Sequence, residues 1–212
     1  MRVTDDRYFR DRRAFDLAWR LIKLGARTGT ISRWTGIAER RVRALQQSYG
    51  SHEPGGAGTL KRPRGQSPYR IDRLLHTLQR QQDGTRFARL CKRTGALPSA
   101  HLADVDRMLP GIERGELLCR SFEIFKHDFP NSTLSIEQAV LLLTELVRRD
   151  EIGLEVCDKC GDVAIVDRLQ PDVHGCAICG NGIESRTVYA NQPVLSGERV
   201  SCGTCRKPDI DS

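Results

Sequence analysis

The sequence lacks any apolar run long enough to cross a membrane. Its longest uninterrupted apolar block, Ala139–Leu143, is far shorter than the roughly 20 residues that a transmembrane helix needs. Residues 1–6 also lack the apolar core of a secretory signal peptide. We therefore expect a cytoplasmic protein that has no membrane partner.

The sequence also lacks the motifs that mark common classes of enzyme. It has no glycine-rich phosphate-binding loop, no metal-binding carboxylate cluster and no Ser–His–Asp combination that suggests a nucleophile with its base. No thioredoxin-like pattern surrounds its C-x-x-C pairs. These absences predict that the chain is not an enzyme, and they disfavour both a nuclease and a dithiol oxidoreductase.

What the sequence does have is a strongly uneven distribution of charge. Residues 1–100 contain 22 Lys or Arg against 8 Asp or Glu, a net charge of +14, whereas residues 101–212 contain 12 against 19, a net charge of −7. A basic half of this strength favours a polyanionic partner, and nucleic acid is the commonest one. A solvated basic surface that only keeps the protein soluble is the alternative.

Apolar residues recur at helical spacing through most of the first 150 residues. The helices that this pattern predicts cover about residues 14–26, 30–35, 38–48, 69–96 and 100–127, the last interrupted by Pro110-Gly111. The clearest further helix is Ser135–Arg149, because Ser135 and Gln138 have the spacing of a capping box. Residues 50–68 are rich in Gly and Pro and carry several basic residues, so they predict a basic linker.

The character of the chain changes after residue 150. Short runs at Val163–Val166 and Arg186–Tyr189 predict strands, separated by Gly, Pro and Cys. We expect a mainly α fold of two domains. The first, residues 1–150, is helical and contains a helix-turn-helix, and the second, residues 151–212, is a small cysteine-rich, zinc-ribbon-like β module.

Residues 28–47 have the pattern of a DNA-binding helix-turn-helix. Gly36 suits the tight turn because a residue without a Cβ adopts positive φ easily, and Ile37 follows as an apolar plug. Val42 and Leu45 share one side of the second helix and are expected to pack it against the first. Many helical hairpins imitate this pattern, and Thr35 stands where an apolar residue is usual.

The opposite side of the second helix is polar, as a recognition helix requires. Arg40 and Arg43 are the candidates for base contact, because arginine is the commonest reader of guanine. Glu39 lies beside them at the start of the same helix. The candidates for phosphate contact are Arg27, Arg33 and Arg41.

Six of the eight cysteines form three C-x-x-C pairs. The first two pairs, Cys157 with Cys160 and Cys176 with Cys179, are 15 residues apart, a spacing typical of zinc sites. Four thiolates complete a tetrahedron and leave no position open to water, as in structural rather than catalytic zinc. We therefore predict one structural Zn²⁺ per chain.

The remaining cysteines leave alternatives open. Cys202 and Cys205 form a third pair, which can replace the first pair around the metal, join a second site shared with another chain, or act as a redox dithiol. Cys91 and Cys119 fall in helical stretches, where a lone cysteine is usually a small buried apolar residue.

Several of these features occur together in one known family. They are Leu24-Gly25-Ala26-Arg27, the helix-turn-helix, Tyr49-Gly50-Ser51, Lys92-Arg93-Thr94-Gly95 and the four spaced cysteines. Over roughly residues 12–180 the chain resembles the FlhC family, whose members work with FlhD as the master activator of bacterial flagellar genes. The resemblance implies zinc at Cys157, Cys160, Cys176 and Cys179. It also implies a hetero-oligomer with an FlhD-like subunit that binds promoter DNA and recruits RNA polymerase.

The sequence thus supports two hypotheses about function. The first is a zinc-containing transcription regulator that binds double-stranded DNA. The alternative is a protein-interaction adaptor in which the zinc cluster holds a protein surface. The acidic second half and the Leu-rich helix over 135–149 favour this alternative.

Overall fold

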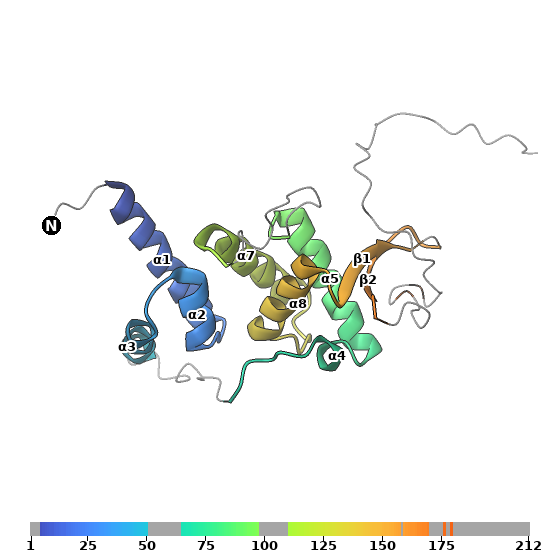
Figure 1. Cartoon of the computed structure of the whole chain (residues 1–212), viewed down its shortest axis with the longest axis horizontal. Helices are drawn as coiled ribbons and strands as arrows, with labels where there is room; N and C mark the ends of the chain where they lie inside the picture. The colour runs from blue at the N-terminus through green and yellow to red at the C-terminus, as the bar shows by residue number, and fades with distance from the viewer. Residues whose placement is uncertain are drawn as a thin grey trace, which may run out of the picture.

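The computed structural model describes residues 5–50, 65–97, 110–157, 159–169, 176 and 179. Its elements are α1 (Asp5–Lys23), α2 (Thr28–Thr35), α3 (Glu39–Gly50), α4 (Ile71–Leu74), α5 (Leu78–Thr94), α7 (Ile112–Asp128), α8 (Ile136–Arg148), β1 (Ile152–Val156) and β2 (Val163–Asp167). The fold is mainly α, as predicted (Figure 1). Among the described residues, no helix combines the length and apolar character that crossing a bilayer requires.

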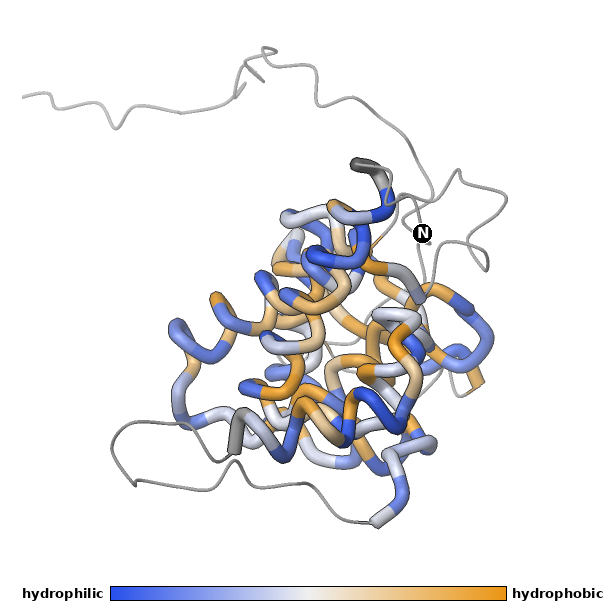
Figure 2. Tube along the Cα trace, turned by 90° about the vertical axis from the view of Figure 1, so that its left-hand side faces the viewer, coloured by the Kyte–Doolittle hydropathy of each residue, from blue (hydrophilic) through white to orange (hydrophobic). Residues whose placement is uncertain are grey.

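The elements follow one another along the molecule. Helices α1, α2 and α3 lie at one end, α5, α7 and α8 form the middle, and the β1–β2 hairpin lies at the other end (Figure 1). Hydrophobic stretches of neighbouring helices turn toward one another, whereas the hydrophilic stretches face outward (Figure 2). One continuous hydrophobic core runs from Ala14 in α1 to Ile152 in β1.

Helix α8 lies in the middle of this core. The predicted capping box is present, because the Ser135 hydroxyl accepts a hydrogen bond from the Gln138 amide and the Gln138 side chain accepts one from the Ser135 amide. Nine of the thirteen residues of α8 are buried. The Leu-rich character of this helix is therefore explained by the core of the chain itself, which removes one argument for the adaptor hypothesis.

A close approach between α7 and α1 fixes the N-terminal helices to the middle of the molecule. A Cβ atom at Gly115 in α7 would lie 2.6 Å from Leu17 Cδ2 and 3.3 Å from Trp34 Cε3. Leu17 and Trp34 are both buried, so neither side chain has room to withdraw. A larger residue at this position would have to displace the Leu17 side chain within the filled core or move the helices apart.

We expect Gly115→Val to lower the free energy of unfolding by about 2 kcal/mol, the usual cost of overpacking a filled core. Gly29→Ala is the matched control. A Cβ at Gly29 meets nothing closer than 3.9 Å, and alanine favours a helix over glycine by about 1 kcal/mol. Chemical denaturation should show a lower free energy of unfolding for Gly115→Val and a higher one for Gly29→Ala than for the native chain. Equal stabilities of the two variants would contradict the close approach at Gly115.

The β1–β2 hairpin packs against α5. Strands β1 and β2 are antiparallel, with Leu154 opposite Ile165, and both side chains pack on the helical core. The Ile165 amide donates to the Thr85 hydroxyl at 3.3 Å, and Arg89 Nε donates to the Val163 carbonyl at 3.0 Å. These contacts with α5 therefore fix the orientation of the hairpin relative to the helices.

The described elements confirm most of the predicted pattern. Strand β2 confirms the run at 163–166, whereas β1 was not predicted. The strand predicted at Arg186–Tyr189, most of the 50–68 linker and residues 100–109 of the 100–127 segment lie outside the described residues. The division into domains 1–150 and 151–212 stays a prediction.

Candidate metal centre and nucleic-acid interface

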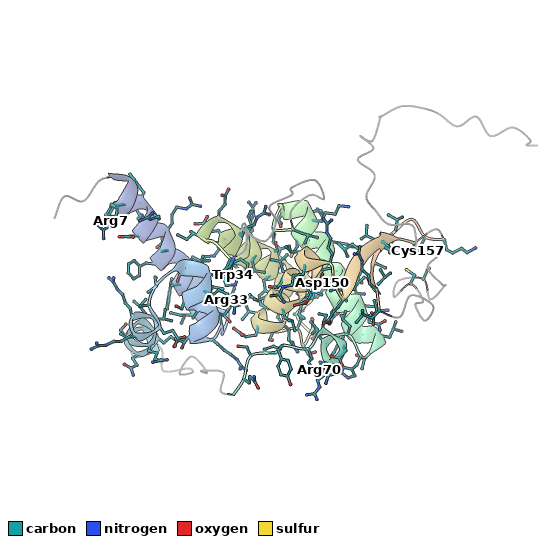
Figure 3. All side chains as sticks on the ribbon, viewed as in Figure 1. Arg7, Arg33, Trp34, Arg70, Asp150 and Cys157 are labelled. Atoms are coloured by element: carbon teal, nitrogen blue, oxygen red, sulfur yellow. The ribbon has the colours of Figure 1, made fainter. Side chains whose placement is uncertain are left out.

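The four cysteines predicted to hold zinc come together in the structure. Cys157 follows β1, Cys160 lies in the turn before β2, and Cys176 and Cys179 come from a later segment. Their four sulfur atoms all lie within 4.8 Å of one another. Cys157 and Cys176 are buried, whereas Cys160 and Cys179 are exposed (Cys157 is labelled in Figure 3).

The distances between the sulfurs suit a metal better than a disulfide. The Cys157 and Cys179 sulfurs are 3.7 Å apart, and so are those of Cys160 and Cys176. A disulfide needs about 2.0 Å. Four sulfurs each about 2.3 Å from a central zinc ion lie about 3.8 Å apart in a tetrahedron. The donor set and its spacing therefore fit a closed, four-thiolate metal site.

Backbone hydrogen bonds shape the first half of this site. The Gly161 amide donates to the Cys157 carbonyl at 2.8 Å, and the Cys157 amide donates to the Asp162 carbonyl at 2.8 Å. Gly161 has a φ of +68°, a left-handed conformation that glycine adopts without strain. The Asp162 carboxylate is held by Arg89 Nη2 of α5 at 2.5 Å. Arg89 therefore ties the metal-binding turn to the helical body.

Cys91 and Cys119 stay apart from this site. Both are buried in helices, as predicted, and burial raises the pKa of each thiol to about 12. Their thiols are therefore protonated at neutral pH and unreactive. Alkylation of the native, metal-loaded chain followed by peptide mass spectrometry should leave both unmodified, and rapid labelling of either would contradict this assignment. Cys202 and Cys205 lie outside the described residues.

The predicted helix-turn-helix is formed by α2, the turn at residues 36–38 and α3. Gly36 has a φ of +73°, and its amide donates to the Ser32 carbonyl, which ends α2. Ile37 and Val42 are buried, and Leu45 packs against the core as expected. Trp34, which the sequence did not single out, is the large buried residue of α2 (labelled in Figure 3).

Thr35 is buried where this motif usually has an apolar residue. Its hydroxyl donates to the Ile31 carbonyl at 2.7 Å and accepts from the Ile37 amide at 3.2 Å. Because both roles of the hydroxyl are satisfied inside the motif, the buried polar atom costs little. The threonine is therefore compatible with a helix-turn-helix.

Five of the six candidate DNA-contacting residues are exposed. They are Arg33 at the end of α2 and Glu39, Arg40, Arg41 and Arg43 on α3. Glu39 and Arg43 form an ion pair of 2.6 Å, and the Arg41 guanidinium lies 4.6 Å from the centre of the Phe15 ring. Within the described part of the chain, Arg33 and Arg40 (Arg33 is labelled in Figure 3) have no ion pair.

Arg27 differs from the other phosphate candidates. Its side chain is only 20% exposed, and Nη1 donates to the Gly65 carbonyl at 2.6 Å. Its Nε lies 4.0 Å from the Glu137 carboxylate. These contacts make Arg27 a structural residue, and they do not support the predicted phosphate contact.

Glu137 of α8 caps the N-terminus of α2, a role that the sequence did not reveal. Arg27, at the N-cap position, provides no side-chain cap. Instead the buried Glu137 carboxylate accepts from the Arg27 amide at 2.8 Å and from the Thr30 hydroxyl at 3.0 Å. A negative charge at a helix N-terminus is favourable because the free amides point toward it. The helix-turn-helix is therefore fixed in position by a residue of the central helix.

Comparison of the sequence with models of known protein families finds no match, and comparison with curated protein sequences finds none either. The function of the chain therefore has to be inferred from its own residues.

Proposed function

We propose that the chain is a zinc-stabilised, DNA-binding subunit of a bacterial transcription regulator. The observation that carries the proposal is the geometry of α2 and α3. The second helix buries Val42 against the first and exposes Glu39, Arg40 and Arg43 at its N-terminal end. Residues 1–100, which contain this motif, carry a net charge of +14.

In this proposal α3 enters the major groove. Arg40 and Arg43 donate to base edges, where arginine recognises guanine with two hydrogen bonds. Glu39 holds the Arg43 guanidinium at 2.6 Å and so limits the directions in which it can donate. Arg33 and Arg41 contact phosphates on either side and contribute affinity without sequence preference.

The metal in this proposal is a structural Zn²⁺ ion held by Cys157, Cys160, Cys176 and Cys179. A tetrahedral site of four sulfurs suits zinc or iron, and elemental analysis of the purified chain distinguishes the two. When bound, zinc supplies free energy of folding to a small module with few apolar residues, and it leaves no position for a catalytic water. The cysteines hold β1, β2 and the later segment together.

The partners follow from the resemblance to the FlhC family. We propose an FlhD-like subunit, promoter DNA and RNA polymerase as partners, activation of transcription as the outcome and flagellar genes as the first targets to examine. Genome-wide crosslinking of the tagged chain in its own cells tests this proposal, because any subunit that the chain requires is present there. Peaks upstream of genes are expected, and no enrichment above background at good expression would favour the adaptor hypothesis.

A binding measurement tests the role of α3 directly. DNA recovered by crosslinking and a scrambled copy are titrated with the purified complex at several salt concentrations. Arg40→Ala with Arg43→Ala should weaken binding to the recovered sequence by at least about 30-fold, because each of the two lost two-pronged contacts contributes about 1–3 kcal/mol. Binding to the scrambled copy should change far less.

Lys92→Ala with Arg93→Ala is the charge-matched control. Both residues are exposed at the end of α5, and their removal lowers the net charge by the same two units. If the control weakens binding as much as the α3 variant does, the contact is only electrostatic and α3 is not a recognition helix. Equal affinity of the native protein for both DNA sequences would likewise refute the proposed regulator.

A further inference from the structure

Helix α1 extends beyond the rest of the molecule at its N-terminal end (Figure 1; Arg7 is labelled in Figure 3). Every residue from Arg7 to Arg12 is exposed, including Phe9 at 59%. Most helices in proteins depend on packing against other elements for their stability. Within the described residues, no other element packs on this part of α1, and its exposed aromatic residues favour a contact with another molecule.

One side of α1 stays accessible beyond this protruding end. Four side chains recur there at spacings of three and four residues, which place them on a single face. We call this face the α1 strip, and its members are Phe9, Arg12, Asp16 and Trp19. The Arg12 and Asp16 side chains are 65% and 71% exposed, and Trp19 is partly buried.

The α1 strip is complementary to itself when two copies run in opposite directions. With a two-fold axis on the strip side of α1, level with Ala14 along the helix, Phe9 of one copy lies opposite Trp19 of the other, and Arg12 lies opposite Asp16. The symmetry produces each pair twice, as in any contact of one surface with its own copy. Two antiparallel helices pack residues spaced by three and four in such layers.

The charges of the strip are available for this contact. Arg12 Nε and Asp16 Oδ2 of the same chain are 3.9 Å apart, too far for a hydrogen bond. An exposed ion pair of this kind contributes little within one chain. In the antiparallel pair the same two groups meet opposite charges on the other copy, at the centre of the contact and between two pairs of aromatic rings. If positions 12 and 16 carried charges of the same sign, the two copies would repel each other at the centre of the contact.

We infer that two copies of this chain associate through the α1 strip, antiparallel about a two-fold axis level with Ala14 along the helix. The protruding end of each α1 lies on the Trp19 region of the other copy. The association involves no residue of α3 and no metal ligand, so it stands independently of DNA binding.

Charge exchange tests the inference. The full-length, metal-loaded chain is studied by sedimentation velocity over a range of concentrations, without DNA. The native chain should show a concentration-dependent dimer. Arg12→Asp gives a strip with two negative charges, and Asp16→Arg gives a strip with two positive charges. Like charges across an interface cost several kcal/mol. Each variant alone should therefore associate at least about tenfold more weakly than the native chain. A mixture of the two variants should restore the dimer.

The mixture is the decisive sample. The strip charges of each variant repel a second copy of the same variant and attract only a copy of the other variant. A native chain that stays monomeric throughout, or variants that each dimerise like the native chain, would overturn the inference. So would a mixture that does not associate while both variants keep the native melting temperature. Phe9→Ala should weaken the dimer, whereas Tyr69→Ala, which removes an exposed aromatic side chain outside α1, should leave it unchanged.

Discussion

Replacing Cys157 with serine should remove the bound metal and unfold the cysteine-rich module. Cys157 is fully buried, and its sulfur lies 3.7 Å from that of Cys179. A serine hydroxyl is a poor ligand for a site of thiolates, and structural zinc contributes about 10–16 kcal/mol of apparent binding free energy in small peptides. The variant should contain less than one zinc ion per chain by elemental analysis and should lose its thermal transition for this module. Cys176→Ser should behave in the same way.

Two control variants separate this result from general damage. Cys119→Ala removes a buried thiol outside the cluster, so it should lower stability and retain zinc. Replacing Cys202 and Cys205 together with serine distinguishes the proposed site from one in which this third pair replaces the first. A Cys157→Ser variant with full zinc and native thermal stability, together with a third-pair variant that loses zinc, would show that the ligands have been assigned wrongly.

The local parts of the fold could be predicted from the sequence. Ser135 and Gln138 predicted the start of α8, and Gly36 predicted the turn of the helix-turn-helix, because each depends on residues a few positions apart. The four cysteines were also predictable, since the geometry of a four-thiolate site restricts the spacing of its ligands. Burial of Val42 followed from helical spacing, and burial of Ile37 from its place in the turn of the motif.

The long-range contacts could not be predicted in this way. Gly115 lies inside a helical pattern, where a glycine is only a weak signal, and its role depends on Leu17 in a different helix. Strand β1 has no clear alternation of polar and apolar residues, because Glu155 is buried in it. Arg27 looked like a free basic residue beside the motif, but Glu137 and Gly65 engage it from distant parts of the chain.

Replacing Glu137 with alanine should loosen the helix-turn-helix. The Arg27 amide and the Thr30 hydroxyl, 110 and 107 positions away in the sequence, would both lose a charged acceptor. Losing a buried, charged hydrogen-bond partner of this kind costs about 3 kcal/mol. Chemical denaturation measures the lost stability, and hydrogen exchange at residues 27–31 should become faster than in the rest of the core.

Glu145→Ala is the matched control for this change. Glu145 is also a buried glutamate of α8, but it is bound by Arg148 of the same helix at 3.1 Å and makes no hydrogen bond to α2. Its removal should lower stability without selectively speeding exchange in α2. If α3 recognises DNA, Glu137→Ala should also weaken binding to the recovered sequence at a temperature where the chain is still folded, because α2 positions α3. Unchanged exchange at residues 27–31 would show that α2 keeps its position without this cap, and that α1 and α7 alone hold the motif in place.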